Sequence, residues 1–197
     1  EGQRHINSFA WAQHDTSVAF WGEPSPTDGM LVQWTGRAIE GMSLEEFVYW
    51  AGLVHGEGLR EYCENFRRRK FRSGCAVFWM FNDVWPTVRS WTPVDYYLRR
   101  TPCFHPVRRA MAPVALALSE EGDEVVVWGI NDTLRAVEAR LDYGLFRLAG
   151  GYPVLESAPV TLAPNASTAI ARFPKSRWAD PAREIAFAEL RERGGGS

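Results

Sequence analysis

The sequence predicts an α/β region up to residue 112, followed from residue 113 by an antiparallel β-sandwich. Three observations support this prediction. An apolar stripe at helical spacing follows Ser43, an unbroken apolar run covers 75–81, and short β-rich runs take over after 113. A long helix that leads through a short turn into a fully apolar strand is typical of parallel α/β units, whose strands are covered on both faces.

The composition of the 197-residue chain excludes several classes of protein. It is 46% apolar and 23% charged, as in an ordinary globular protein, and its net charge of -2 gives no general attraction to nucleic acid or to an acidic membrane surface. No apolar run approaches the roughly 20 residues that a membrane span needs. The nine tryptophans are the outlier, because flat apolar rings are typical of sugar-binding clefts.

The cysteines and histidines do not predict a metal or a cofactor. Cys63, Cys75 and Cys103 are odd in number and lack metal-ligand spacing, so we expect buried thiols and no disulfide framework. His55 has no metal partner at the right spacing, and helix packing explains it better than catalysis. His14 beside Asp15 fits a loop-bracing pair better than the edge of a pocket.

Residues 1–42 show neither a helical nor a strand period, although aromatic residues recur. We expect this stretch to be an ordered segment that packs on a larger part of the protein. The clearest helix follows, over 44–70. Ser43 and Glu46 form a capping box at its start. Three glycines, at 52, 56 and 58, predict close packing or a kink. The basic run 67–70 ends the helix, where cations balance the helix dipole; phosphate binding is the weaker alternative.

The apolar run that ends at Phe81 turns abruptly polar at Asn82 and Asp83. In an α/β barrel the carboxyl end of a strand faces the active site, which would put both side chains where the chemistry happens. A simple turn that caps the strand explains the same two residues equally well. Spacing alone leaves both interpretations open.

From residue 113 the pattern changes to short β-rich runs, which indicates a β-sandwich. Gly, Asn, Asp and Pro turns separate the expected strands, which are 114–119, 124–132, 136–145, 153–162, 167–173 and a last strand from 184. We expect the last strand to lead into a hairpin, but the final four residues also fit a glycine-rich tag.

A pattern over about 50 residues, from 66 to 114, resembles glycoside hydrolase family 2, and within it the β-mannosidase-like enzymes and their exo-glucosaminidase relatives. The motif consists of a basic helix end, a glycine, W-x-x-N-D-x-W-P, S-W-x-x-x-D-Y-Y and A-P-V. Its residues here are Arg67–Lys70, Gly74, Trp79, Asn82, Asp83, Trp85, Pro86, Ser90, Trp91, Asp95, Tyr96, Tyr97 and Ala112–Val114.

The resemblance implies a fold and a reaction. Residues 1–112 would be the C-terminal portion of a (β/α)8 catalytic barrel, with 74–81 as its eighth strand, and 113–197 an immunoglobulin-like sandwich, whole or incomplete. The reaction would be retaining hydrolysis of terminal β-linked sugars, which needs two carboxylates about 5–5.5 Å apart. The resemblance places both catalytic glutamates before residue 1, so no catalytic residue is expected in the chain; Glu1 is an outside candidate for the nucleophile.

The same resemblance assigns substrate binding to four residues, Trp79, Asn82, Asp83 and Trp85. A tryptophan stacks on the C–H face of a pyranose, and the two polar side chains bind hydroxyls or orient a loop. The expected partners are a carbohydrate substrate and the remainder of the same enzyme chain, without cofactor, nucleic acid or membrane. The alternative is a non-catalytic carbohydrate-binding or structural module; a flat aromatic row on the sandwich would favour it.

Overall fold

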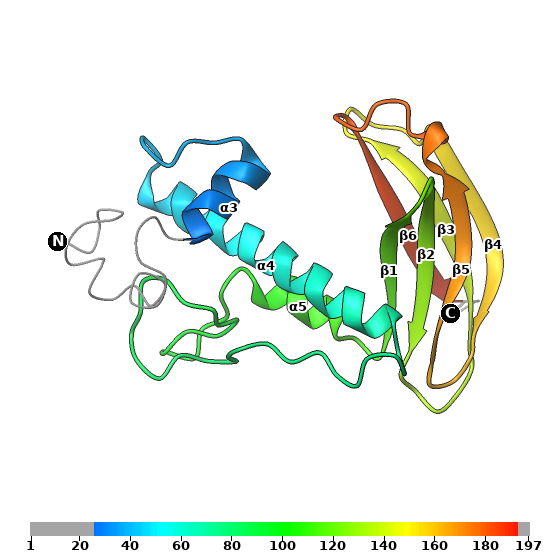
Figure 1. Cartoon of the computed structure of the whole chain (residues 1–197), viewed down its shortest axis with the longest axis horizontal. Helices are drawn as coiled ribbons and strands as arrows, with labels where there is room; N and C mark the ends of the chain where they lie inside the picture. The colour runs from blue at the N-terminus through cyan, green and yellow to red at the C-terminus, as the bar shows by residue number, and fades with distance from the viewer. Residues whose placement is uncertain (1–25, 193–197) are drawn as a thin grey trace, which may run out of the picture. The chain divides into compact units, whose positions relative to one another are not determined.

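The structure, a computed structural model, describes residues 26–192. Three helices, α3 (Pro26–Thr35), α4 (Leu44–Arg68) and α5 (Phe104–Ala110), precede six strands in this part of the chain (Figure 1). The described residues form two compact units. The helical unit contains those up to Tyr62 together with Val77–Arg109, and the sandwich unit contains Cys63–Ala76 together with the chain from Ala110.

Helix α4 begins as the sequence predicts. The Ser43 N–H donates to Glu46 Oε2 at 2.9 Å, and the Glu46 N–H donates to Ser43 Oγ at 3.2 Å. This reciprocal pair is the predicted capping box, and its hydrogen bonds from Ser43 lower the pKa of Glu46. The helix then continues without interruption to Arg68, so the prediction of one long helix after Ser43 is confirmed.

Two of the glycines in α4 allow another segment to approach the helix closely. A Cβ at Gly52 would lie 2.7 Å from Pro102 Cγ, and one at Gly56 would lie 2.9 Å from the Cys103 Cα. Real Cβ atoms essentially never approach so closely, so a side chain at either position would force the two segments apart. Of the two predicted explanations for these glycines, the structure supports close packing, because the helix continues through them.

The helical unit has a small core between α3 and α4. Leu31 of α3 and Phe47 of α4 are fully or almost fully buried, and Val88 from the later loop packs against the same cluster. Through Val88, this core anchors the loop that also contains Asp83 and Trp85, two of the predicted site residues.

The segment 74–81 is not a strand, so that part of the prediction is wrong for the described chain. Its backbone is irregular and three of its large side chains are exposed, with Val77 at 70%, Trp79 at 75% and Phe81 at 59%. A parallel strand needs a neighbour to pair its backbone and layers to cover its faces. No strand within residues 26–192 pairs with it, and no barrel is seen among these residues.

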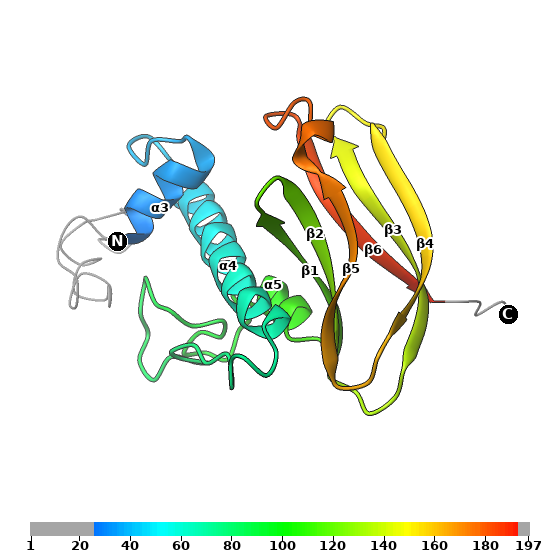
Figure 2. The ribbon, with the colours of Figure 1, turned by 45° about the vertical axis from the view of Figure 1, so that its right-hand side comes forward.

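The β-sandwich is present, as predicted. One sheet has the order β1 (Val114–Glu121), β2 (Glu124–Asn131), β5 (Ala166–Pro174). The other has the order β4 (Val154–Leu162), β3 (Val137–Arg147), β6 (Glu184–Glu192), and all neighbouring strands are antiparallel (Figure 2). A short 3₁₀ turn, η2 (Lys175–Arg177), follows β5.

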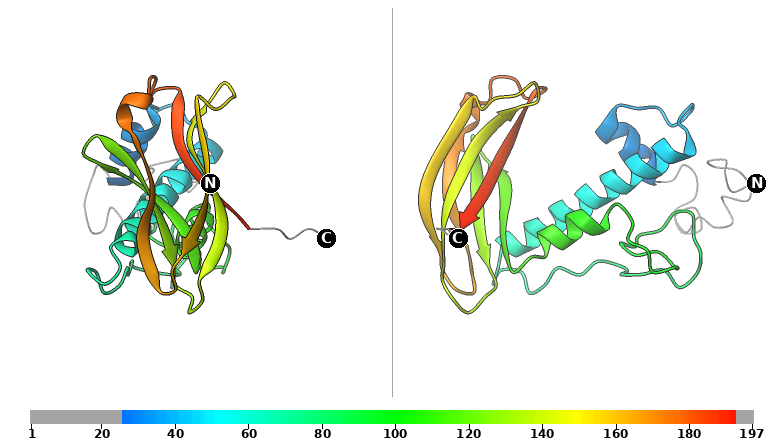
Figure 3. Two further views of the ribbon diagram at one scale, coloured as in Figure 1. Left: turned by 90° about the vertical axis from the view of Figure 1, so that its right-hand side faces the viewer. Right: turned by 180° about the vertical axis from the view of Figure 1, so that it is seen from behind.

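The sandwich core comes from the alternate residues that face inward from both sheets. Its buried members are Val125, Val127, Leu141, Tyr143, Leu145, Val154 and Phe173. Gly144, at φ +145°, lies on the opposite face of β3, and a Cβ there would meet the Val154 carbonyl at 2.1 Å. Only glycine tolerates this position, where β3 and β4 approach closely. The six strands are seen from two further sides in Figure 3.

Candidate functional site

Several of the motif residues after Phe81 lie in a closed loop. The Asp83 N–H donates to the Val94 carbonyl at 3.2 Å, and the Val94 N–H donates back to the Phe81 carbonyl at 3.1 Å. This pair of bonds makes an isolated parallel bridge between Asn82 and Val94. Residues 83–94, which we call the Asp83 loop, therefore leave and return to the same point of the helical unit.

The carboxylate of Asp83 is buried inside this loop, with only 6% of the residue exposed. It accepts a hydrogen bond from Ser90 Oγ on one oxygen and from Thr92 Oγ1, at 2.8 Å, on the other. A buried carboxylate is costly unless it is hydrogen-bonded, and here both oxygens are. Asp83 thus joins the start of the loop to its returning half.

A second buried charge attaches the loop to the helices. Arg89, within the loop, pairs with Asp28 of α3, and both side chains are almost completely buried. The guanidinium also lies over the ring of Phe47, 5.6 Å from its centroid. Removing one partner of such a pair leaves an uncompensated buried charge, which typically costs about 3–5 kcal/mol.

A cavity of about 340 Å³ lies between the Asp83 loop and helices α3 and α4. Its size is in the usual range for small-molecule sites, and its wall is mostly apolar. Asp83, Trp91 and His55 line it, and burial lowers the pKa of His55. Further lining residues are Met30, Phe47, Val48, Ala51, Ser90, Thr92 and Asp95.

The four predicted site residues do not share one environment. Asp83 lines the cavity, whereas Trp79, Asn82 and Trp85 are absent from its described lining. Those three are exposed, and the Asn82 side-chain amide donates to the Asp83 carbonyl at 3.2 Å. Their predicted contacts with a sugar remain predictions.

The sequence analysis missed the buried Arg89–Asp28 pair, whose partners are 61 residues apart and carry no local signal. It could have found the hydroxyl partners of Asp83, since Ser90 is itself a motif residue and Thr92 follows two positions later. Glu1, His14 and Asp15 lie outside the described residues.

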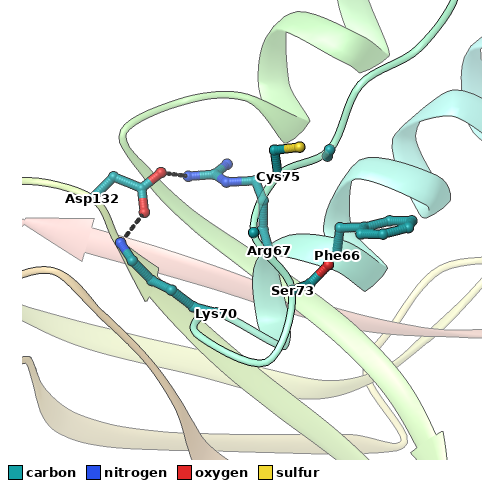
Figure 4. Close-up of a pocket in the computed structure, with 8 residues that line it drawn as sticks. Phe66, Arg67, Lys70, Ser73, Cys75 and Asp132 are labelled. Atoms are coloured by element: carbon teal, nitrogen blue, oxygen red, sulfur yellow. Dashed lines mark hydrogen bonds and ion pairs between the residues drawn. The ribbon is translucent and has the colours of Figure 1, made fainter.

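A second hollow, of about 250 Å³ and with polar and apolar lining in equal measure, lies in the sandwich unit at the basic end of α4. Figure 4 shows Asp132 between Arg67 and Lys70, with Nη2 and Nζ at 2.8 Å and 2.6 Å from its two oxygens. Burial works against ionisation of Asp132, but the hydrogen bonds from Lys70 and Arg67 prevail and lower its pKa. Because Asp132 pairs with Arg67 and Lys70, and Glu121 pairs with Arg68, structural pairing accounts for the basic run better than phosphate binding.

Cys63 and Cys103 are buried free thiols, and burial raises the pKa of both; Cys75 is exposed, so the expectation of a buried thiol is wrong there. In the described part of the chain, no group of three or more His, Cys, Asp or Glu residues is arranged to hold a metal. Likewise, no helix described there is long and apolar enough to span a membrane.

Comparison with known proteins agrees with the motif. Residues 123–196 match the family described as Mannosidase Ig/CBM-like domain. β-Mannosidase B of Emericella nidulans is 29% identical over 146 residues, which cover 64% of this chain and 17% of that protein. The chain thus spans less than a fifth of this curated relative.

Two solved structures are similar in fold. The β-D-mannosidase of Dictyoglomus thermophilum has a TM-score of 0.68 at 25% identity, over 74% of this chain and 18% of that one. An exo-β-D-glucosaminidase has a TM-score of 0.69 at 18% identity, over 98% of this chain and 24% of that one. At that identity the second likeness concerns the fold alone.

Proposed function

The chain is β-mannosidase-like, a part of a glycoside hydrolase of family 2, and on this premise we propose that it forms one wall of the active site of a retaining exo-β-glycosidase. Such an enzyme removes terminal β-linked sugars from oligosaccharides. The observation that carries the proposal is the Asp83 loop. It contains Asp83, Trp85, Pro86, Ser90 and Trp91 of the family motif, and buried hydrogen bonds hold it in one shape beside a cavity.

The proposed catalytic carboxylates belong to other parts of a longer protein. Retaining hydrolysis requires a nucleophile and an acid/base about 5–5.5 Å apart. Since the chain spans only 17% of its β-mannosidase relative, there is ample room for both elsewhere. The partner of this chain is then the remainder of the same enzyme.

Residues 74–81 would be a barrel strand in that longer protein. Exposure alternates along the segment, with Val77, Trp79 and Phe81 exposed and Phe78 and Met80 half-buried. This period of two is that of an extended strand. Exposed apolar side chains on such a segment favour burial against a neighbour, which the remainder of the enzyme would provide.

The roles proposed for the exposed motif residues follow from their chemistry. Trp79 and Trp85 present large ring faces that suit the C–H face of a pyranose. Asn82 has an amide that both donates and accepts hydrogen bonds, as sugar hydroxyls do.

One observation favours the alternative of a non-catalytic carbohydrate-binding module. Phe146, Tyr152 and Phe187 form a ring cluster beside the sheet β4-β3-β6, with centroids 5.5 Å and 5.2 Å apart. The neighbouring rings are tilted by 60° and 57°, so they do not form the flat row that stacks on a sugar chain. The enzyme wall is therefore the preferred proposal.

Binding of manno-oligosaccharides by this chain tests the proposal. Saturation-transfer NMR at millimolar sugar is sensitive enough for a partial site. We expect Trp85→Ala to remove the transfer and Tyr152→Ala to preserve it, because only Trp85 belongs to the proposed wall. Loss with Tyr152→Ala and retention with Trp85→Ala would instead establish the sandwich as the binding module.

A further inference from the structure

We propose that Asp83 is a positioning residue, which sets the shape of the loop bearing Trp85 and Trp91 and does not itself touch the sugar. The inference rests on the proposed function of the loop and assigns a different role to one of its motif residues. Its basis is the environment of the Asp83 carboxylate, which is directed into its own loop.

Three bonds start from Asp83 and end on the returning half of the loop. The carboxylate accepts from the hydroxyls of Ser90 and Thr92, and the backbone N–H donates to the Val94 carbonyl. Residues 90, 92 and 94 lie at alternate positions, as in a short extended stretch. Asp83 thus holds residues 90–94 at three points. These bonds offset part of the entropy cost of ordering the loop.

A separate contact attaches the loop to the rest of the helical unit. The internal shape of the loop can therefore be tested independently of its position in that unit. Arg89 pairs with Asp28 of α3 and so determines where the loop lies within the helical unit. The carboxylate and the N–H of Asp83 bond only within the loop, and its carbonyl accepts from the neighbouring Asn82 amide. Disrupting Asp83 should therefore loosen the loop while the Arg89 attachment remains.

Direct contact between Asp83 and a sugar conflicts with its burial. With 6% of the residue exposed and each carboxylate oxygen accepting from Ser90 or Thr92, a sugar hydroxyl that replaced either bond would displace a hydroxyl of the loop. Displacement would leave a buried hydroxyl to find another partner, at a cost of about 1–3 kcal/mol. The adjacent Asn82 is exposed and needs no such displacement.

The choice of variants follows from hydrogen-bonding capacity. The carboxamide in Asp83→Asn can still accept from one hydroxyl and donate to the other, whereas Asp83→Ala removes both bonds. Ser90→Ala and Thr92→Val remove one bond each. Asp95→Asn is the matched control, because its carboxylate in the same region bonds to Arg99 and not to the Asp83 loop.

Amide hydrogen exchange of the whole chain is the primary measurement, with amides of β1–β6 as an internal standard for folding. We expect Asp83→Ala to raise exchange at the Val94 and residue-83 amides by about tenfold or more. Ser90→Ala and Thr92→Val should raise it at the same amides, Asp83→Asn should raise it less, and Asp95→Asn should leave it unchanged. If Asp83→Ala also unfolds the sandwich unit, the two hydroxyl variants decide.

Sugar binding, followed through the assigned indole N–H signals of Trp85 and Trp91, is the second measurement. If Asp83 is a positioning residue, we expect Asp83→Asn to retain sugar binding and Thr92→Val to weaken it. The proposal is overturned if exchange near the loop is unchanged in both Asp83→Ala and Thr92→Val. It is equally overturned if Asp83→Asn abolishes binding with wild-type exchange. Absence of binding by the unmutated chain would count against the proposed function alone, since the exchange result still decides the role of Asp83.

Discussion

Two apolar runs look alike in the sequence and lie in opposite environments in the structure. Val125, Val126 and Val127 of β2 are at most 2% exposed, whereas Val77 and Trp79 are mostly exposed. β2 pairs with β1 on one side and β5 on the other, and its inward residues meet the second sheet. The run 75–81 has no strand partner within residues 26–192. An apolar run therefore favours burial. Whether it is buried depends on which other segments are present to pack against it.

The largest expected effect concerns catalysis. If the run 75–81 is an unpartnered part of a larger site, the chain alone should hydrolyse aryl β-mannoside, β-glucosaminide and β-galactoside no faster than buffer. Loss of a positioned general acid alone typically costs about 10²–10⁴-fold in rate. Turnover that is abolished by Glu1→Gln or Asp83→Asn would show that the chain has catalytic residues of its own.

The next effect compares one substitution in the two runs. Val127→Asp places a charge in the sandwich core without a partner and should destabilise the fold by about 3–5 kcal/mol. Val77→Asp, at an exposed position, should change stability by less than about 0.5 kcal/mol. Urea unfolding followed by circular dichroism measures both. Comparable losses would mean that the run 75–81 is packed in solution.

A smaller effect is expected at the end of α4, inside the sandwich unit. Arg67 donates to the carbonyls of Ala110 and Ala112 and to Asp132, so Arg67→Ala should cost about 2–3 kcal/mol. The control is Arg69→Ala, because Arg69 is exposed and its Nε bonds within the helix to the Asn65 carbonyl. We expect that variant to melt within a degree or two of the unmutated protein. Equal losses would refute the assigned role of Arg67.

The smallest effect is a pH dependence. The folded-state pKa of Asp132 is lowered, so its contribution is complete above the unfolded value of 3.8 and is lost as pH falls through the folded value. Because the side chain is partly exposed, we expect about 1 kcal/mol or less. Asp132→Asn should reduce the loss of stability below pH 4 in denaturant titrations. An unchanged acid profile would show that the Lys70 and Arg67 bonds contribute little.

The spacing of residues in the sequence was sufficient to predict the structure wherever the interacting residues lie close together in the chain. The capping box joins positions 43 and 46, and the hairpin β1–β2 turns within 121–124, so both were predictable. Short-range hydrogen bonds and alternation depend on a few neighbouring dihedral angles, which the local sequence largely controls. The resemblance to a family motif added the proposal of a function, which periodicity alone left open.

By itself the sequence determined the capped helix after Ser43, the six sandwich strands and the membership of Asp83 and Trp85 in one motif. Only the tertiary structure decided that Asp83 is buried against Ser90 and Thr92, that Arg89 pairs with Asp28, and that Val77, Trp79 and Phe81 are exposed. The physical reason is that burial and ion pairing depend on which distant segments are present to contact a residue. A strand-like sequence without neighbouring strands has no partner for its backbone and no cover for its side chains.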